Sequence, residues 1–143
     1  MQLHMKYLLE PASAPRLAAD VVAAASDISD AELDYSPDSI GLVEEIVDGF
    51  RSDGVTGGEV AESLVSFGCY VGEVLIRHGG GAWRHTPGGA RTVPLVVEVP
   101  GAGRCSPIDW VFRRLEQGPG VSILALYAQA GQGESRPAEK PEC

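Results

Sequence analysis

The stretch "VAESLVSFGCYVGEVLIRHGGGAWRH" (residues 60–85) decides the fold, because it reads as a long helix that is apolar over most of its circumference. Thr56 and Glu59 form a T-x-x-E capping box before it, and the glycines after His78 are typical of a left-handed helix end. The pattern predicts a helix over about 57–78 that neighbouring elements contact on two sides. Gly68 and Gly72 would let one neighbour approach closely.

Two strands and two further helices are predicted after this helix. Residues 82–86 and 92–99 are rich in strand formers, and the segment "TPGGAR" between them is typical of a hairpin loop. Pro94 indicates either an edge position or a strand start for the second strand. Ser106 and Pro107 begin a helix that Gly118 ends. Residues 121–130 fit a strand or a helix, and their three alanines favour a helix.

The segment before the long helix also carries clear start signals. In "LDYSPDSI" (residues 33–40), Ser36 is a good N-cap, Pro37 suits the first helical turn, and Tyr35 and Ile40 have the spacing of a hydrophobic staple. The helix that follows would end near Gly54. Residues 13–26 read as an alanine-rich helix, and residues 2–9 as a short strand or extended lead-in. The acidic segment 27–34 lacks the order of a calcium loop and is expected to be a solvated loop.

These elements predict one α+β domain over residues 1–130. We expect four or five helices, one of them long and central, packed with a small antiparallel sheet over about 82–99. The 143-residue length suits a single core. Residues 131–143 are polar and rich in Pro and Gly, which predicts a disordered tail.

The charge balance restricts the partners. The chain has 11 Lys and Arg against 20 Asp and Glu, a net charge of -9. Nucleic acids and anionic membranes bind through clustered basic residues, so neither is expected, whereas a basic partner is. Cys69, Cys105 and Cys143 show no C-x-x-C, so we expect no disulfide framework. With no signal peptide and no membrane span, the sequence predicts a cytoplasmic protein.

Candidate catalytic groups gather around the triple glycine. Glu73 and Arg77 have the spacing of an exposed i,i+4 ion pair, and we favour this interpretation. The alternative is an acid–base site formed by Tyr70, Glu73, His78 and His85. His78 would more simply cap the end of the helix. No metal is predicted, because the spacing of the two histidines matches no known ligand pattern, and no nucleotide or other cofactor motif is present.

A binding surface is the other candidate. In "PIDWVFRRL" (residues 107–115), Trp110 lies off the apolar stripe, beside Arg113 and Arg114. An outward Trp with neighbouring Arg is the composition of a binding hot spot. The competing interpretation is that Trp110 packs beneath another element of the same domain.

The segments "LDYSPDSI", "YVGEVLIRHGGGAW" and "SPIDWVFRRLEQGPG" together resemble a family of small uncharacterised bacterial proteins. The resemblance covers about residues 33–120 and supports the order of elements, but it implies no activity. Two functions therefore stay open. The first is a non-enzymatic adaptor or immunity-type inhibitor of a basic protein or peptide partner. The second is a small cofactor-free tailoring enzyme in a peptide or natural-product pathway. Dimerisation through the Gly68 and Gly72 face is a further expectation.

Overall fold

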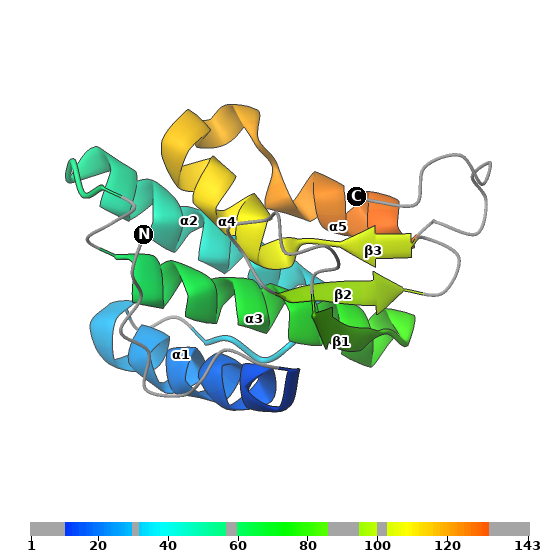
Figure 1. Ribbon diagram of the computed structural model, residues 1–143. Coiled ribbons are helices and arrows are strands. Elements are labelled where there is room, and N and C mark those ends of the chain that lie inside the picture. Colours follow the sequence, from blue (N-terminus) through cyan, green and yellow to red (C-terminus); the bar gives the residue numbers. More distant parts are fainter. Residues whose placement is uncertain (1–10, 30–31, 57–59, 86–94, 100–102, 132–143) are drawn as a thin grey trace.

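The computed structural model describes residues 11–29, 32–56, 60–85, 95–99 and 103–131 (Figure 1). Within them the chain forms five α-helices and one three-stranded antiparallel sheet, so the predicted α+β fold is confirmed. The helices are α1 (Ala14–Ser29), α2 (Ile40–Ser52), α3 (Ala61–Gly79), α4 (Pro107–Gln117) and α5 (Ile123–Gly131). The strands are β1 (Ala82–His85), β2 (Leu95–Val99) and β3 (Gly103–Cys105), and the short 3-10 helices are η1 (Pro11–Ser13), η2 (Pro37–Ser39) and η4 (Gly118–Gly120).

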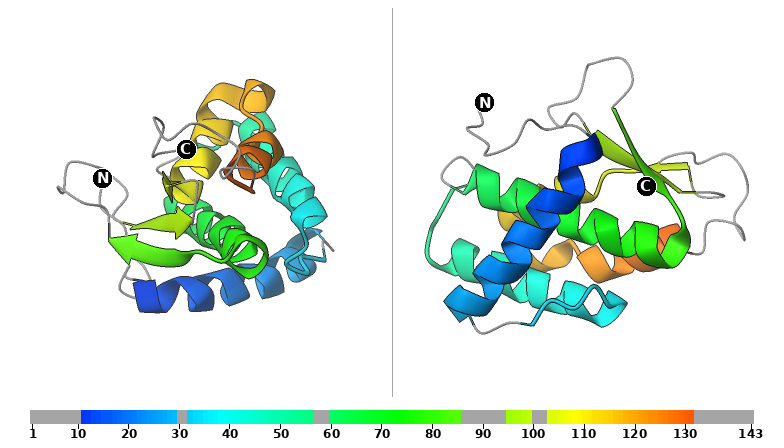
Figure 2. Two further views of the ribbon diagram at one scale, coloured as in Figure 1. Left: turned by 90° about the vertical axis from the view of Figure 1, so that its right-hand side faces the viewer. Right: turned by 90° about the horizontal axis from the view of Figure 1, so that it is seen from below.

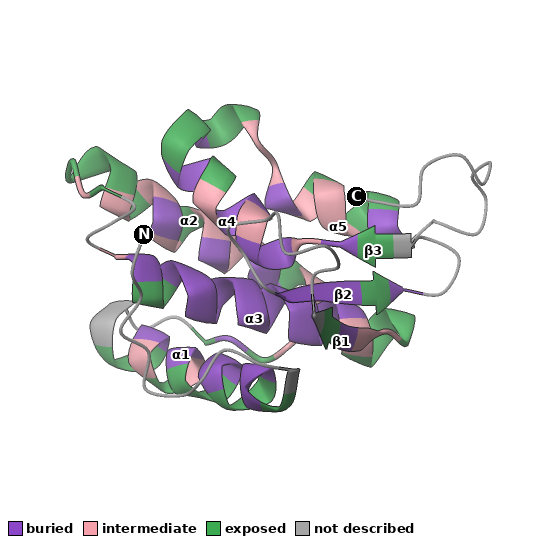
Figure 3. Cartoon of the chain, viewed as in Figure 1, coloured by how far each residue is buried: buried purple, intermediate pink, exposed green. Residues whose placement is uncertain are grey.

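Helix α3 is the centre of the molecule, as predicted. The sheet and α1 lie on one side of it, and α2, α4 and α5 lie on the other (Figure 2). Every residue from Leu64 to Leu75 is buried, so this helix is purple along most of its length in Figure 3. A helix that is buried all round needs neighbours on every side, and this requirement accounts for the layered arrangement.

The two glycines on α3 are contact points for those neighbours. A Cβ atom on Gly68 would lie 2.3 Å from the Cα of Ile108 in α4. A Cβ atom on Gly72 would lie 2.3 Å from the ring of Trp83 in β1. The predicted close approach is therefore confirmed. Both glycines are buried against other parts of the same chain, and dimerisation stays a prediction.

The sheet has the order β1-β2-β3. In the β1–β2 pair Trp83 lies opposite Val97, and in the β2–β3 pair Val97 lies opposite Cys105. The edge position considered for the second strand is wrong, because β3 pairs with its free side. The three residues of β3 are too few to show a strand pattern, and the sequence analysis missed them.

The predicted helix ends are correct to within a few residues. Ser36 accepts a hydrogen bond from the Ser39 amide with its side chain, so it caps η2, which leads directly into α2. The long helix begins later than predicted, since α3 starts at Ala61 after Val60, which makes no side-chain cap. It also ends one residue later, with Gly80 rather than Gly79 in the left-handed conformation (φ 77°). Gly54 and Gly118 have positive φ at the ends of α2 and α4.

Several expectations fall on other parts of the chain. The lead-in at residues 2–9, the hairpin loop, Glu59 of the capping box and the tail beyond residue 131 lie outside the described residues. Cys69 is a free, buried thiol. Cys105 is disulfide-bonded. No helix in the described ranges combines the length and the apolar character needed to cross a bilayer.

Candidate functional site

Tyr70 of α3, a residue of the alternative acid–base site, is buried. It is 0% exposed, because the segment that leads into η2 crosses α3 at this point. The Tyr70 hydroxyl accepts a hydrogen bond from the Tyr35 amide at 2.7 Å and lies 2.6 Å from the Ser39 hydroxyl oxygen. Burial raises the pKa of Tyr70. This hydroxyl therefore stays protonated at neutral pH and holds the crossing segment onto α3.

Glu73 is also buried, at 7% exposure, beneath β1. The indole Nε1 of Trp83 donates to its Oε2 at 3.0 Å, and its Oε1 lies 3.7 Å from Nε of Arg77. The predicted Glu73–Arg77 pair is present, but only Arg77 is exposed. The prediction of an exposed pair is wrong for Glu73, because the sheet covers that side of α3.

His78 and Arg77 are exposed and contact the crossing segment through Tyr35. The ring Nε2 of His78 lies 2.9 Å from the carbonyl oxygen of Tyr35, to which it donates. The guanidinium carbon of Arg77 lies 3.7 Å from the centre of the Tyr35 ring. Tyr35 has φ 65°, the only positive value at a described non-glycine residue. His78 thus fixes this strained residue, whereas we had expected it to cap its own helix.

These contacts form one connected set, which we call the strap network. It consists of the crossing segment Asp34–Ser39 together with Tyr70, Glu73, Arg77, His78 and Trp83. Tyr70, Glu73 and His78, the catalytic candidates of the alternative interpretation, all belong to it. His85 lies in β1 opposite Leu95, and its side chain is not among those described. The described polar groups of the network bond to one another, which is an arrangement suited to fixing the fold.

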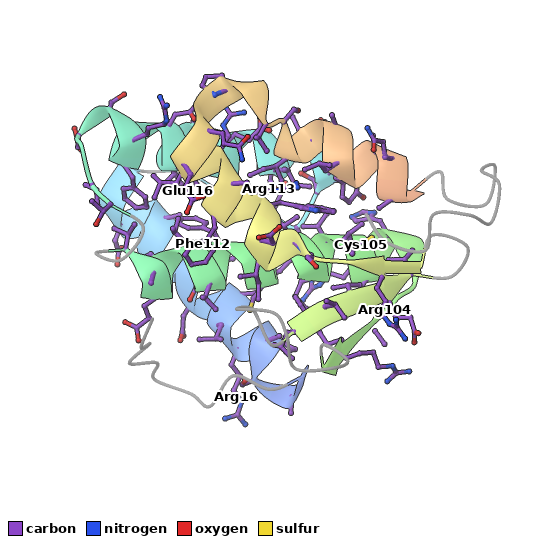
Figure 4. All side chains as sticks on the ribbon, turned by 45° about the horizontal axis from the view of Figure 1, so that its top comes forward. Arg16, Arg104, Cys105, Phe112, Arg113 and Glu116 are labelled. Atoms are coloured by element: carbon purple, nitrogen blue, oxygen red, sulfur yellow. The ribbon has the colours of Figure 1, made fainter. Side chains whose placement is uncertain are left out.

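The predicted binding residues on α4 have different positions from those expected. Trp110 is 1% exposed and belongs to the core, so the expectation of an outward Trp is wrong and the competing interpretation holds. Arg114 is 7% exposed and donates to both carboxylate oxygens of Asp48 in α2, at 2.9 and 2.7 Å. Arg113 is exposed and pairs with Asp109 on its own helix (Figure 4). The three residues therefore form no common surface.

The buried Arg114 belongs to a structural cluster that the sequence analysis missed. Its guanidinium also lies 3.6 Å from Glu44 and donates to the carbonyl of Val121 at 2.8 Å. Glu44 accepts from the amides of Ile123 and Leu124 and so caps α5. The negative charge suits a helix N-terminus. Only the spacing of Glu44 and Asp48 on one helix hinted at this cluster, and that spacing equally fits an exposed face.

A groove lies between α1 and α3, where sequence reasoning had placed no candidate. Its volume is about 220 Å³. Its lining comes from both helices: Leu17, Asp20, Val21, Ala24, Glu62, Ser63 and Ser66. Leu17 and Val21 are buried and form an apolar floor, whereas Asp20 and Glu62 are exposed. Among the residues that the structure describes, neither carboxylate makes an ion pair.

The described side chains give little support to a metal site. In the described part of the chain, no three His, Cys, Asp or Glu side chains are grouped so that they could hold a metal ion. The strap network is built from groups that already have partners, whereas the two carboxylates of the groove form no ion pair with a described residue. Comparisons of the chain with protein-family models, with curated proteins and with solved structures found no match.

Proposed function

We propose that the protein is a non-enzymatic binding protein, an adaptor or immunity-type inhibitor, whose partner is a basic protein or peptide. We also propose that the chain belongs with the small uncharacterised bacterial proteins that it resembles, a resemblance that implies no activity. The proposed partner follows from the distribution of charge over the described surface.

One observation carries the proposal: the described arginines all interact within the chain, whereas many described carboxylates are exposed and form no ion pair with a described residue. Every arginine of the described residues has an interaction within the chain: Arg16, Arg51, Arg77, Arg84, Arg104, Arg113 and Arg114. Nine described carboxylates are exposed and form no ion pair with a described residue: Asp20, Asp27, Glu32, Asp34, Asp38, Glu45, Asp53, Glu62 and Glu116. Unpaired surface carboxylates attract a basic partner and repel an acidic one.

The catalytic alternative has weaker support. The polar side-chain atoms of Tyr70 and Glu73 are hydrogen-bonded to Tyr35, Ser39 and Trp83. Both side chains are therefore poorly placed to bind a substrate. The one feature in favour of a tailoring enzyme is the positive φ of Tyr35 beside the exposed His78, because strained residues gather at functional sites.

The test is capture of a partner by the tagged chain, followed by reconstitution of the complex from purified components. We expect a partner with a basic surface, whose affinity falls as salt is raised. Glu45→Gln with Asp53→Asn should weaken this binding, whereas His78→Ala should leave it unchanged. A partner whose binding ignores salt would contradict the proposal. Turnover of a small molecule or peptide that His78→Ala abolishes would support the enzyme instead.

A further inference from the structure

The groove between α1 and α3 lies where the two helices cross, the arrangement seen from below in Figure 2. Its two walls each contribute one exposed carboxylate, Asp20 from α1 and Glu62 from α3. Beneath them lie Leu17 and Val21, which are 2% and 5% exposed. None of the described residues that line the groove is basic. It therefore combines an apolar floor with a negatively charged rim.

The size of the groove restricts its occupant. A volume of about 220 Å³ is smaller than the roughly 300–1,000 Å³ of pockets that hold metabolites or drugs. It suits a single side chain better. Two carboxylates above an apolar floor select a side chain with a cationic end and an aliphatic stem.

Arginine fits this description better than lysine. Its planar guanidinium presents several N–H donors in a fixed fork and can bond two carboxylates at once, whereas an ammonium is a single point of charge. Its three methylene groups can cover the apolar floor while the head stays at the rim. Ser63 and Ser66 add hydroxyl groups on the α3 wall of the groove.

We propose that this groove is the docking site for an arginine side chain of the partner, with Asp20 and Glu62 holding its guanidinium. The proposal rests on the basic partner proposed above and adds the place and the ligand class. A second copy of the chain is a poorer occupant, because its net charge of -9 repels the acidic rim.

The probe for this test is N-acetyl-arginine methylamide, titrated into the isotope-labelled protein and followed by amide chemical shifts. The matched control is the same derivative of citrulline, which has nearly the same shape and no charge. We expect the arginine probe to shift amides at residues 17–24 and 62–66, and citrulline to shift them far less. Equal effects of the two probes, or shifts confined to other elements, would overturn the proposal.

Two double variants show which carboxylates bind the arginine probe. Asp20→Asn with Glu62→Gln should weaken binding of the arginine probe about tenfold or more, because it removes both negative charges that accept hydrogen bonds from the guanidinium. Glu45→Gln with Asp53→Asn removes the same charge from α2 and its end, and should change the affinity less than twofold. Equal weakening by the two pairs would mean that only the overall charge acts, and the groove would lose its role.

The same variants separate this proposal from the proposed function. A purified basic partner that binds the Asp20→Asn, Glu62→Gln protein as tightly as the wild type would overturn the groove and leave the function standing. Arginine that docks in the groove of a protein with no salt-sensitive partner would support the ligand class and contradict the function. A dimer that the groove variant dissociates, measured by sedimentation, would assign the groove to a second copy and overturn the arginine proposal.

Discussion

Gly68 sets how closely α3 and α4 approach each other. The space that a side chain on Gly68 would need is occupied by the backbone of Ile108. Backbone atoms cannot rotate away as the end of a flexible side chain can. Gly49 on α2 offers a contrast, because a Cβ atom there would meet nothing within 4 Å. The two glycines therefore separate the effect of close packing from the general cost of glycine in a helix.

We expect Gly68→Ala to lower the free energy of unfolding by about 1–3 kcal/mol, the usual cost of overpacking a core. Gly49→Ala should raise it by about 0.5–1 kcal/mol, because alanine loses less backbone entropy in a helix. Urea unfolding of both variants beside the wild type measures the difference. A Gly68→Ala protein as stable as the wild type would mean that α4 moves away from α3 without cost.

Cys69 gives the molecule a pH dependence in the alkaline range. Burial, with a smaller contribution from the charge of Glu73, raises the pKa of its thiol to about 12, whereas an unfolded cysteine has a pKa of about 8.5. Above the unfolded value the unfolded chain loses this proton and the folded chain keeps it. The stability linked to Cys69 is therefore complete below about pH 8.5 and is lost as pH rises towards the folded value.

The expected slope is at most about 1.4 kcal/mol per pH unit between about pH 9 and 11. Cys69→Ala should flatten it, and the remaining slope would come from groups such as Tyr70, whose pKa burial also raises. Unfolding free energies at several pH values measure both slopes. Identical slopes in the two proteins would show that Cys69 does not carry the dependence.

The contact between α2 and α4 depends on the buried, positively charged guanidinium of Arg114. Arg114 is almost buried and bonds Asp48 with two N–H groups, while its neighbour Arg113 is exposed and pairs with Asp109 on the same helix. The adjacent arginines have the same chemistry and very different surroundings. Removing one partner of a buried pair leaves the other charge without compensation, which costs far more than losing an exposed pair.

Arg114→Met should therefore lower the free energy of unfolding by about 2 kcal/mol, less than a fully buried pair because Asp48 keeps 37% of its side chain exposed. Arg113→Met should change it by less than about 0.5 kcal/mol. Thermal and urea unfolding compare the two variants. Similar losses in both would mean that the buried position of Arg114 contributes nothing.

The same pair predicts an acid response. The hydrogen bond from Arg114 lowers the pKa of Asp48 below its ordinary value. The stability linked to this carboxylate is present above the unfolded pKa of about 3.9 and is lost as pH falls below it towards the folded value. Arg114→Met should weaken this loss. Acid unfolding curves that keep the wild-type shape in the variant would contradict the assignment.

Most helices could be predicted because their signals are local. Ser36 caps η2 and leads into α2, and Gly54, Gly118 and the glycines after α3 have the residue type that a helix end requires. The strand β3 could not be predicted, because three residues are too few to show a strand period, although it pairs with β2, the strand just before it in the sequence. The start of α3 was misplaced because its N-terminus has no side-chain cap to mark it.

The described elements share one core, so we expect them to unfold together. Trp83 lies in β1 against α3, and Trp110 lies on α4, so the two indoles report on different parts of the molecule. The variants Trp83→Phe and Trp110→Phe each keep one tryptophan. In each variant, the fluorescence of that tryptophan and the far-ultraviolet circular dichroism should give the same urea midpoint. Different midpoints for the two signals of one variant would show that the sheet and α4 unfold separately.

The sequence by itself determined the α+β class, the central position of the long helix, the close approach at Gly68 and Gly72, and the acidic balance of the chain. All of these follow from period, spacing and composition, which act locally or add up over the chain. The tertiary structure alone decided which polar side chains are buried. A polar face of a helix is exposed to solvent only where no other element covers it. Here the crossing segment Asp34–Ser39 covers Tyr70, and the sheet covers Glu73. Arg114 is enclosed by α2 and by the segment after α4. The groove arises in the same way, because its two carboxylates come from helices that meet only in the folded chain.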